Sequence, residues 1–149
     1  ANLFITCTDS KNSRIQLSKL LKAYRSNNSY TDYNTPLYWT DYGNAQKTGQ
    51  VIVGTIRKNI KQPESKKFET VQRLPFVTEY VKGYTRYKEE ESGPSCSLAE
   101  ALGKQDLFVN SSLAHLGCSL LWKMFREGVI FFHGFYMNLD TMHVNPITL

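Results

Sequence analysis

The stretch that decides the fold is Leu3-Phe4-Ile5-Thr6-Cys7, which is followed at once by Thr8-Asp9-Ser10. An apolar run of this kind is typical of a strand that is buried on both faces of a parallel sheet. Asp9 or Ser10 can cap a helix, because a side-chain oxygen at that place accepts hydrogen bonds from the first backbone N–H groups. The sequence therefore predicts a buried strand, a tight turn and a helix.

The elements that follow are predicted from apolar spacing and from turn residues. The first helix ends in the cluster 26–29, and its apolar positions recur at near-helical spacing: Ile15, Leu20, Leu21 and Tyr24. Leu37 to Asp41 and Gln50 to Ile56 indicate two strands, and the loop between them contains Gly43, Asn44 and Gly49. A hairpin is the simplest connection between these strands.

The segment 57–95 is polar and is interrupted by Pro63, Pro75, Gly83 and Pro94, so we expect a long crossover. Within it, four residues are apolar enough to pack: Leu74, Phe76, Val77 and Tyr80. A short helical turn is expected at Leu98 to Leu102. A longer helix is expected from Asp106 to Gly128, where glycine stops it. Its buried face is predicted to consist of Val109, Leu113, Leu116, Leu120 and Met124.

Two strands close the chain, Val129 to Asn138 and Met142 to Ile147, with Gly134 as a bulge or a close approach. They are expected to be antiparallel. The order of elements predicts an α/β fold, a mixed sheet with packed helices, over a single unit, 1–149. The large aromatic residues are expected in the core or at an interface: Trp39, Trp122, Phe131, Phe132, Phe135 and Tyr136.

The formal net charge is +5, which would weakly favour an acidic partner, but the excess is local. Basic residues crowd 57–73 and three glutamates follow at 89–91, so a solvated loop of mixed charge is the simpler interpretation. Nucleic acid stays a minor alternative. The cysteines form no CxxC pair, so no zinc site is expected, and no apolar run reaches the roughly 20 residues of a membrane span. We expect a cytoplasmic protein.

The chain begins with Ala1, and all three methionines lie beyond residue 120. This indicates a processed or excised piece. If Leu3 to Cys7 is a central strand, it also needs neighbouring strands from a missing N-terminal half or from another chain.

Candidate chemistry begins at the turn Cys7-Thr8-Asp9-Ser10, with Arg14 one helical turn further on. Open α/β sheets bind ligands at the carboxyl edge of their strands, where this turn is predicted. A carboxylate there can hold a hydrated Mg²⁺ on a nucleotide phosphate. The alternative is that Asp9 or Ser10 only caps the helix and that Arg14 points to solvent.

This turn resembles an element of the activating-enzyme superfamily, in which a strand ends in Thr-Asp-Asn or a similar triplet and an Arg follows five residues after the Asp. A second stretch, Pro94 to Leu102 followed by Gln105 to Asn110, resembles the ThiF family of the bacterial PRTRC gene system, as do Tyr38 to Asn44, Thr48 to Ile52 and His133 to Leu139. The resemblance covers nearly the whole chain. It implies the C-terminal half of a Rossmann-like ThiF fold.

The resemblance further implies an ATP-dependent adenylyltransferase that activates the C-terminus of a small protein partner, works with ATP and Mg²⁺, and pairs into a homodimer. Asp9 would face the Mg·ATP side and Arg14 would help to fix the turn. The sequence departs from the family in lacking GxGxxG and the zinc-binding CxxC pairs, and Ser10 replaces the common Asn. The piece alone is therefore expected to be inactive, and a non-catalytic interaction module of the same fold stays the alternative.

Cys96 resembles the thioester-forming cysteine of some superfamily members, since it precedes the helical turn predicted at Leu98 to Leu102. A helix N-terminus lowers a thiol pKa and so supplies thiolate. The alternative is a half-buried structural cysteine. Cys7 and Cys118 are expected to be inert core residues, and structural roles are expected for the three histidines: His115, His133 and His143.

Overall fold

The structure is a computed structural model, and it describes residues 2–26, 35–57, 60, 64, 66–86, 103 and 105–148. Its elements are, in chain order, β1 (Leu3–Thr6), α1 (Lys11–Ser26), β2 (Tyr38–Asn44), β3 (Thr48–Thr55), α2 (Val77–Tyr80), the 3₁₀ helix η1 (Tyr84–Arg86), α4 (Val109–Glu127), β4 (Phe132–Asn138) and β5 (His143–Thr148). The expected turn at 98–102 lies outside the described residues.

The described strands form one mixed sheet in the order β1-β2-β3-β4-β5. β1 and β2 are parallel, with Thr6 opposite Asp41, and the pairs β2–β3, β3–β4 and β4–β5 are antiparallel. Both predicted hairpins are therefore confirmed, although the bounds differ: β2 continues to Asn44 and β3 starts at Thr48, both inside the predicted loop, and β4 begins at Phe132 rather than at Val129. The fold is α/β, and the crossover from β1 through α1 supplies its parallel pair.

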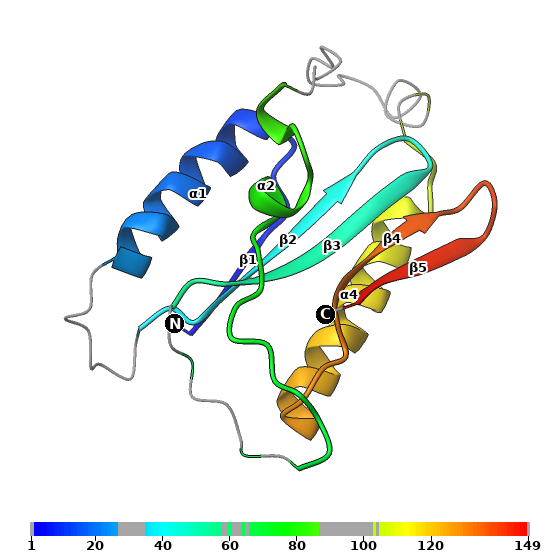
Figure 1. The fold of residues 1–149 in the computed structure, drawn as a ribbon. Helices are drawn as coiled ribbons and strands as arrows, with labels where there is room; N and C mark the ends of the chain where they lie inside the picture. Colours follow the sequence, from blue (N-terminus) through cyan, green and yellow to red (C-terminus); the bar gives the residue numbers. More distant parts are fainter. Residues whose placement is uncertain are drawn as a thin grey trace.

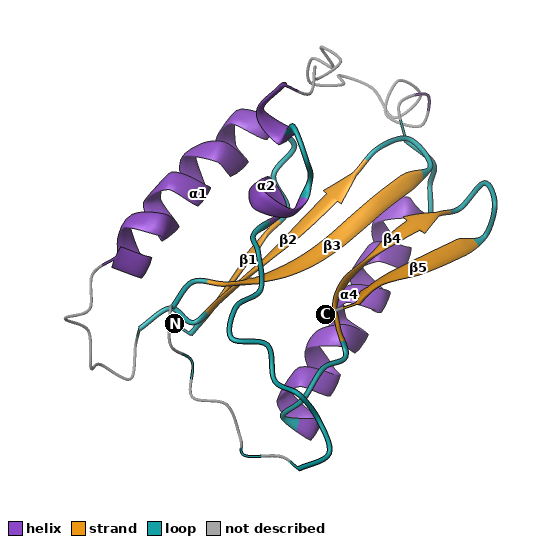
Figure 2. Cartoon of the chain, in the orientation of Figure 1, coloured by secondary structure: helices purple, strands orange, loops and turns teal. Residues whose placement is uncertain are grey.

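Helices cover both faces of the sheet (Figure 1). α1 and α2 lie on one face, which we call the α1 side, and α4 lies on the other, which we call the α4 side (Figure 2). Successive residues of a strand point to opposite faces, so each strand contributes to two separate layers. The consequence is two cores of different chemistry, one on each side of the sheet.

The core on the α4 side is mainly hydrocarbon. It consists of two neighbouring clusters, one with Val51, Val109, Leu113, Phe135 and Met137 and one with Val53, Leu74, Leu120 and Leu121. α4 presents this face through Val109, Leu113, Gly117, Leu120 and Leu121. Leu116 was predicted to belong to it but is 37% exposed, because the helix turns Gly117 rather than Leu116 toward the sheet. Gly128 ends α4 in a left-handed conformation, as predicted.

The core on the α1 side contains Leu21, Trp39, Ile52, Ile56, Phe76, Val77 and Ile147. Phe76 meets Trp39 edge to face, with ring centroids 5.1 Å apart. Leu74, Phe76 and Val77 pack as predicted. The buried face of α1 differs from the predicted one, because it is formed by Arg14, Ser18 and Leu21, whereas Leu20 and Tyr24 are more than half exposed.

β1 corrects a second prediction. The strand is present, but it is not buried on both faces, since Phe4 is 41% and Ile5 is 53% exposed. The physical reason is its position, because among the described strands β1 lies at the edge and pairs only with β2. Gly134, in contrast, is as predicted, since a Cβ there would lie 2.2 Å from the carbonyl oxygen of Val51, and the β4–β5 register shifts at the same place.

Candidate functional site at the end of strand β1

The candidate site is the turn between β1 and α1, at the carboxyl end of the strand. Ser10 caps the helix, because its Oγ accepts a hydrogen bond from the Ser13 N–H at 3.3 Å. Ser10 rather than Asp9 is therefore the helix cap. Asp9 is exposed and makes no hydrogen bond or ion pair with any described residue. Asp9 is thus a carboxylate held beside a helix N-terminus and open to solvent.

Arg14 lies directly below this turn and is buried, with 8% of its surface exposed. Its Nε donates to both carboxylate oxygens of Asp41, at 2.8 and 3.0 Å, and its Nη2 donates to the Tyr42 carbonyl at 2.9 Å. The alternative in which Arg14 points to solvent is therefore wrong. Arg14 ties the first turn of α1 to the end of β2.

The same carboxylate is also tied to β1. Thr6 Oγ1 donates to Asp41 Oδ1 at 2.8 Å, and Trp39 Nε1 donates to Thr6 Oγ1 at 2.8 Å. A chain of hydrogen bonds thus runs from Trp39 through Thr6 and Asp41 to Arg14. Such a network is stable only if its members are satisfied, and it fixes β1, β2 and α1 relative to one another.

Burial and pairing oppose each other in this network. Burial lowers the pKa of Arg14, but the attraction of Asp41 and the neighbouring Tyr84 outweigh it and leave that pKa raised. Burial raises the pKa of the Asp41 carboxyl, while Arg14 and the Thr6 hydroxyl act to lower it. Since the Arg14–Asp41 contact is short and almost entirely enclosed, losing either partner would leave a charge buried alone.

The turn fits one part of a magnesium–nucleotide site. An exposed carboxylate such as Asp9 suits a hydrated Mg²⁺, which prefers oxygen ligands and keeps most of its waters. Beside it, Thr8 Oγ1 is buried and has no hydrogen-bond partner among the described residues. The site is incomplete for a nucleotide, however, because the sequence has no glycine-rich turn to hold the phosphates.

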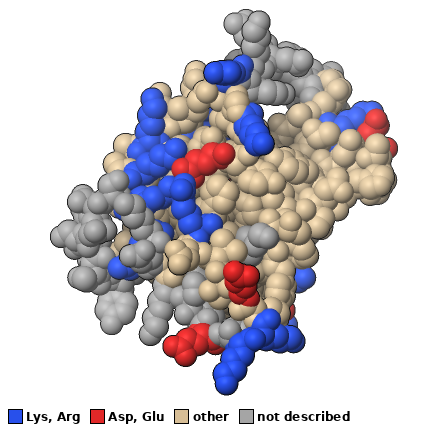
Figure 3. All heavy atoms as spheres, viewed as in Figure 1, with Lys and Arg blue, Asp and Glu red and all other residues tan. Residues whose placement is uncertain are grey.

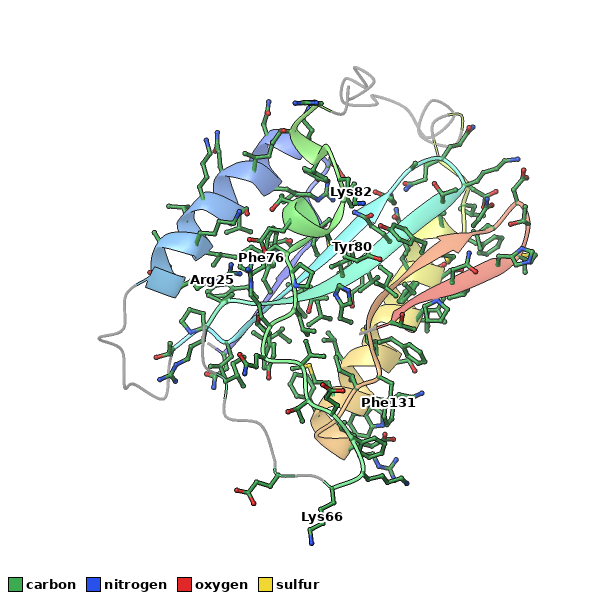
Figure 4. All side chains as sticks on the ribbon, viewed as in Figure 1. Arg25, Lys66, Phe76, Tyr80, Lys82 and Phe131 are labelled. Carbon is green, nitrogen blue, oxygen red and sulfur yellow. The ribbon has the colours of Figure 1, made fainter. Side chains whose placement is uncertain are left out.

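A second group of charges lies on the α1 side, where Figure 3 shows Lys and Arg gathered over α1 and α2. Glu79 forms ion pairs there with Lys22, Arg25 and Arg73, at 3.3, 3.3 and 2.5 Å. Arg25 points toward Phe76 (Figure 4). Its guanidinium carbon lies 4.3 Å from the centre of the Phe76 ring, and its Nη2 donates to the Thr55 carbonyl at 2.9 Å. These contacts attach α2 to α1 and β3.

Burial on its own raises the pKa of Glu79, but the Phe76 amide and the Arg73 and Arg25 guanidinium groups lower it to about 2. Glu79 therefore stays ionised over the whole ordinary pH range. Its role is structural.

The cysteines differ from the predictions. Cys7 and Cys118 were expected in the core, yet both are free thiols at the surface. Cys7 is exposed because β1 is an edge strand, and Cys118 because it lies one residue past the sheet-facing Gly117. Cys96 lies outside the described residues. The structure therefore places Asp9 in the β1–α1 turn and Arg14 in the first turn of α1, with the Arg14 side chain directed at Asp41. It does not place Cys96 relative to them.

Two of the three histidines have backbone partners. His115 Nδ1 lies 2.7 Å from the Ser111 carbonyl and His133 Nδ1 lies 3.2 Å from the Val53 carbonyl. Burial lowers the pKa of His133, although the hydrogen bond to the Val53 backbone acts to raise it. His115 and His143 also line a groove of about 410 Å³ between α4 and the β4–β5 hairpin, but this groove lies on the α4 side, away from Asp9.

Sequence reasoning missed Asp41, Thr6 and Trp39 as the support of the turn. A signal was present, because Trp39 and Asp41 are two residues apart on one strand and so share a face, which placed a charge in a predicted core. A buried carboxylate requires a cationic partner, and Arg14 follows the neighbouring strand. The pairing of β1 with β2 was the missing step.

No protein-family model matches the sequence, and no curated protein matches it at a significant level. Within the described part of the chain, no helix is long and apolar enough to cross a membrane. The same residues contain no group of three or more His, Cys, Asp and Glu side chains that is placed to hold a metal ion.

Proposed function

We propose that this chain is part of a ThiF-like ATP-dependent activating protein, an adenylyltransferase that acts on the C-terminus of a small protein partner. One observation carries the proposal: Asp9 is left open to solvent at the carboxyl end of β1, while the neighbouring Arg14 is fixed by Asp41. This division supports the roles that the resemblance implies for Asp9 and Arg14. Because the Asp9 carboxylate makes no contact within the described fold, it is available to a ligand.

In this proposal Asp9 would hold a hydrated magnesium ion through its waters, and Arg14 is a positioning residue that acts through the backbone of α1. Bound ATP would supply the adenylyl group, with pyrophosphate as the leaving group. Electrostatic groups that are held in place before the reaction lower its barrier, because they do not need to reorganise as charge develops. The network of Thr6, Asp41 and Arg14 provides that rigidity for the turn.

The test is ATP–pyrophosphate exchange by the chain joined to a glycine-rich nucleotide-binding half, with candidate small proteins as substrates. Asp9→Asn should preserve the fold and abolish exchange, whereas Asp140→Asn, a matched change of a carboxylate on the β4–β5 turn, should preserve both. Exchange that survives Asp9→Asn within about threefold, or about 0.7 kcal/mol, would exclude the role of Asp9. The 149-residue chain alone is expected to show no exchange.

For Cys96 we keep the proposal of a thioester nucleophile. It requires that Cys96 be alkylated faster than Cys7 and Cys118, with a pH midpoint below the roughly 8.5 of a free thiol. Cys96→Ser should then permit adenylation and block the thioester. Because Cys7 and Cys118 are themselves exposed, faster alkylation of Cys96 would reflect its reactivity and not only its accessibility. Labelling of Cys96 no faster than theirs would leave it without a catalytic role.

An interaction module is the second candidate function, and one observation favours it. Apolar side chains remain exposed at the β1 edge and on the outer face of α4: Phe4, Ile5, Trp122 and Phe125, each at least 41% exposed. Exposed apolar groups on neighbouring elements mark contact surfaces in many proteins. We propose that they contact the rest of the protein or a second copy. A strictly monomeric mass at high concentration would count against the homodimer.

A further inference from the structure

Positive charge is concentrated on the α1 side of the sheet. α1 contains five basic residues and no acidic one, and the segment 73–86, which includes α2 and η1, contains three basic residues and one acidic residue, Glu79. Of these eight cations only Arg14 is buried. The other seven, which we call the basic strip, are Lys11, Lys19, Lys22, Arg25, Arg73, Lys82 and Arg86. The excess of positive charge is therefore not confined to the segment 57–73, where the sequence predicted it.

Contacts hold the two segments side by side, so that their charges form one surface. Lys11 Nζ donates to the Thr85 carbonyl at 3.3 Å near the start of α1, and Ser18 Oγ lies 2.7 Å from Thr78 Oγ1 in the middle of the helix. Near the end of α1, Arg25 forms its ion pair with α2. α1 has 16 residues, which corresponds to a length of about 24 Å. The basic strip therefore extends along the whole helix.

The lysines of α1 share one flank of the helix. At 3.6 residues per turn, Lys11, Lys19 and Lys22 lie within about 80° of one another around the axis. Lys11 contacts η1 and Lys22 contacts α2, so this flank is the one that faces those elements. The exposed apolar residues Leu20 and Tyr24 lie on the opposite flank. The charge is thus sorted to one face of the molecule, as Figure 3 shows.

The basic strip keeps a net positive charge. Glu79 pairs with three of its cations, and no other Asp or Glu belongs to either segment. One carboxylate does not neutralise three cations, so an anionic partner is favoured. Nucleic acid fits the length of the strip, because the phosphates of one strand recur about every 3.4 Å and about seven of them span the roughly 24 Å of α1.

The basic strip borders an aromatic and polar part of the sheet. The Tyr80 ring of α2 meets the His133 ring of β4 edge to face, with centroids 5.1 Å apart, and Tyr80 stays 38% exposed. Tyr136, further along β4, is also 38% exposed. In the strand register Tyr136 stands between Gln50 of β3 and Asn145 of β5. An exposed ring is thus flanked by two amide side chains.

This row of side chains lies on the same side of the sheet as the basic strip. A Cβ on Gly43 would lie 3.2 Å from Arg14 Nη2 and 3.3 Å from Gln50 Nε2, which places Gln50 on the α1 side. Residues directly opposite on neighbouring strands share a face, so Tyr136 and Asn145 are on that side too. Aromatic rings stack on nucleobases, and amides hydrogen-bond to base edges. The row therefore has the chemistry to receive unpaired bases.

We propose that the α1 side binds single-stranded nucleic acid, with the phosphates along the basic strip and the bases on Tyr80 and Tyr136. A positively charged track beside aromatic side chains is the combination by which proteins bind single strands without sequence preference. A duplex keeps its bases paired and would use the basic strip alone. The surface does not include Asp9, so this inference is independent of the adenylation proposed above.

The experiment is fluorescence anisotropy of labelled oligo-dT and oligo-U strands of about 12 nucleotides, titrated with the 149-residue chain. Both strands should bind, and the affinity should fall at least about tenfold between 50 and 200 mM salt, because phosphate contacts release counterions. Binding of neither strand at 50 mM salt would overturn the proposal.

Paired charge reversals test the place of binding. Lys19→Glu with Lys82→Glu should weaken binding of oligo-dT at least tenfold. The matched control is Lys123→Glu with Arg126→Glu on α4, which changes the net charge equally and should weaken binding less than threefold. All four side chains are exposed, so both variants should unfold within a few degrees of the wild type. Equal losses of affinity would overturn the proposal, because binding would then reflect net charge alone.

The contribution of the bases is tested separately. Tyr136→Ala should weaken binding of oligo-dT at least about fivefold, whereas Tyr136→Phe, which keeps the ring, should change it less than twofold. An abasic strand of equal length should bind the wild type at least about fivefold more weakly than oligo-dT, a comparison that needs no variant. Equal binding of the abasic strand, or tighter binding of duplex DNA or of vesicles with anionic lipid, would overturn the proposal, because the surface would then recognise negative charge without bases.

Discussion

The two faces of the sheet are held by different forces. On the α4 side, Val51, Leu113 and Phe135 pack as hydrocarbon, and the structure buries few charges there. On the α1 side, the contact depends on polar groups: the buried Arg14–Asp41 pair at one end of α1 and the partly buried Arg25–Glu79 pair at the other. The polar side is the one that carries the Asp9 turn.

Stability and structural specificity therefore come from different faces of the sheet. Apolar contacts contribute most of the free energy of folding but are not directional, whereas an enclosed ion pair contributes little net free energy and accepts only one geometry. The α4 side can therefore hold the sheet together. The α1 side fixes the position of one turn.

The largest expected effect breaks the polar side. Arg14→Leu should lower the free energy of unfolding by about 3–5 kcal/mol, because it leaves the Asp41 carboxylate buried without its cation. The double variant Arg14→Leu with Asp41→Leu should lose less free energy of unfolding than the two single variants lose in sum. Urea unfolding of all four proteins measures the coupling, and costs that add within about 0.5 kcal/mol would contradict it.

A change on the apolar side should act through packing. Gly117→Ala should cost about 1–2 kcal/mol, because overpacking against the Tyr42 ring outweighs the better helix propensity of Ala. In a Tyr42→Leu background the sign should reverse, with Ala stabilising by up to about 1 kcal/mol. Thermal unfolding of Gly117→Ala in both backgrounds measures the two effects. Ser119→Ala on the exposed face of α4 controls for helix propensity. Destabilisation in both backgrounds would show that the ring is not the cause.

The pH dependence separates the two sides further. The pKa of Glu79 is lowered from its ordinary 4.5 to about 2, so its contribution is complete above pH 4.5 and is lost as the pH falls through about 2. Between pH 4.5 and about 2, the wild type should lose about 1–2 kcal/mol of its free energy of unfolding relative to Glu79→Gln. This is less than the full pKa shift implies, because Lys22 and Arg73 are half exposed. Parallel stability curves for the two proteins would rule this out.

The smallest effect is expected on the outer face of α4. Trp122 is 61% exposed, so Trp122→Ala should change the free energy of unfolding by no more than about 0.5 kcal/mol. The same change should weaken any self-association through this face. Sedimentation equilibrium measures the association, and a loss of stability above 1.5 kcal/mol would instead place Trp122 in the core of the folded chain.

Much of the fold was predictable, because apolar spacing and turn residues depend on local sequence. The two hairpins, the long helix and its Gly128 stop follow from such patterns. The burial of β1 was not predictable, since an apolar run reads the same whether a strand has one neighbour or two. Leu20 and Leu116 were wrongly predicted on the buried faces of their helices, because apolar spacing alone does not fix which face points to the sheet. Gly117 is buried but carries no apolar side chain that could indicate it.

The site was predictable only in part. Asp9 and Arg14 stand near one another in the sequence, and their turn was located at the strand end. Asp41 is 27 residues from Arg14, and their contact depends on which strand pairs with β1. Long-range pairing of this kind leaves no periodic trace in a single sequence.

We propose that, of the two carboxylates near the end of β1, Asp41 maintains the fold and Asp9 is available for a ligand. Urea unfolding of Asp9→Asn beside Asp41→Asn, on the 149-residue chain, tests it most directly. Asp9→Asn should lower the free energy of unfolding by less than about 1 kcal/mol, the range of a helix-dipole interaction, and Asp41→Asn should lower it by at least about 2 kcal/mol. Equal losses, or a larger loss at Asp9, would contradict it, because Asp9 would then be a structural residue.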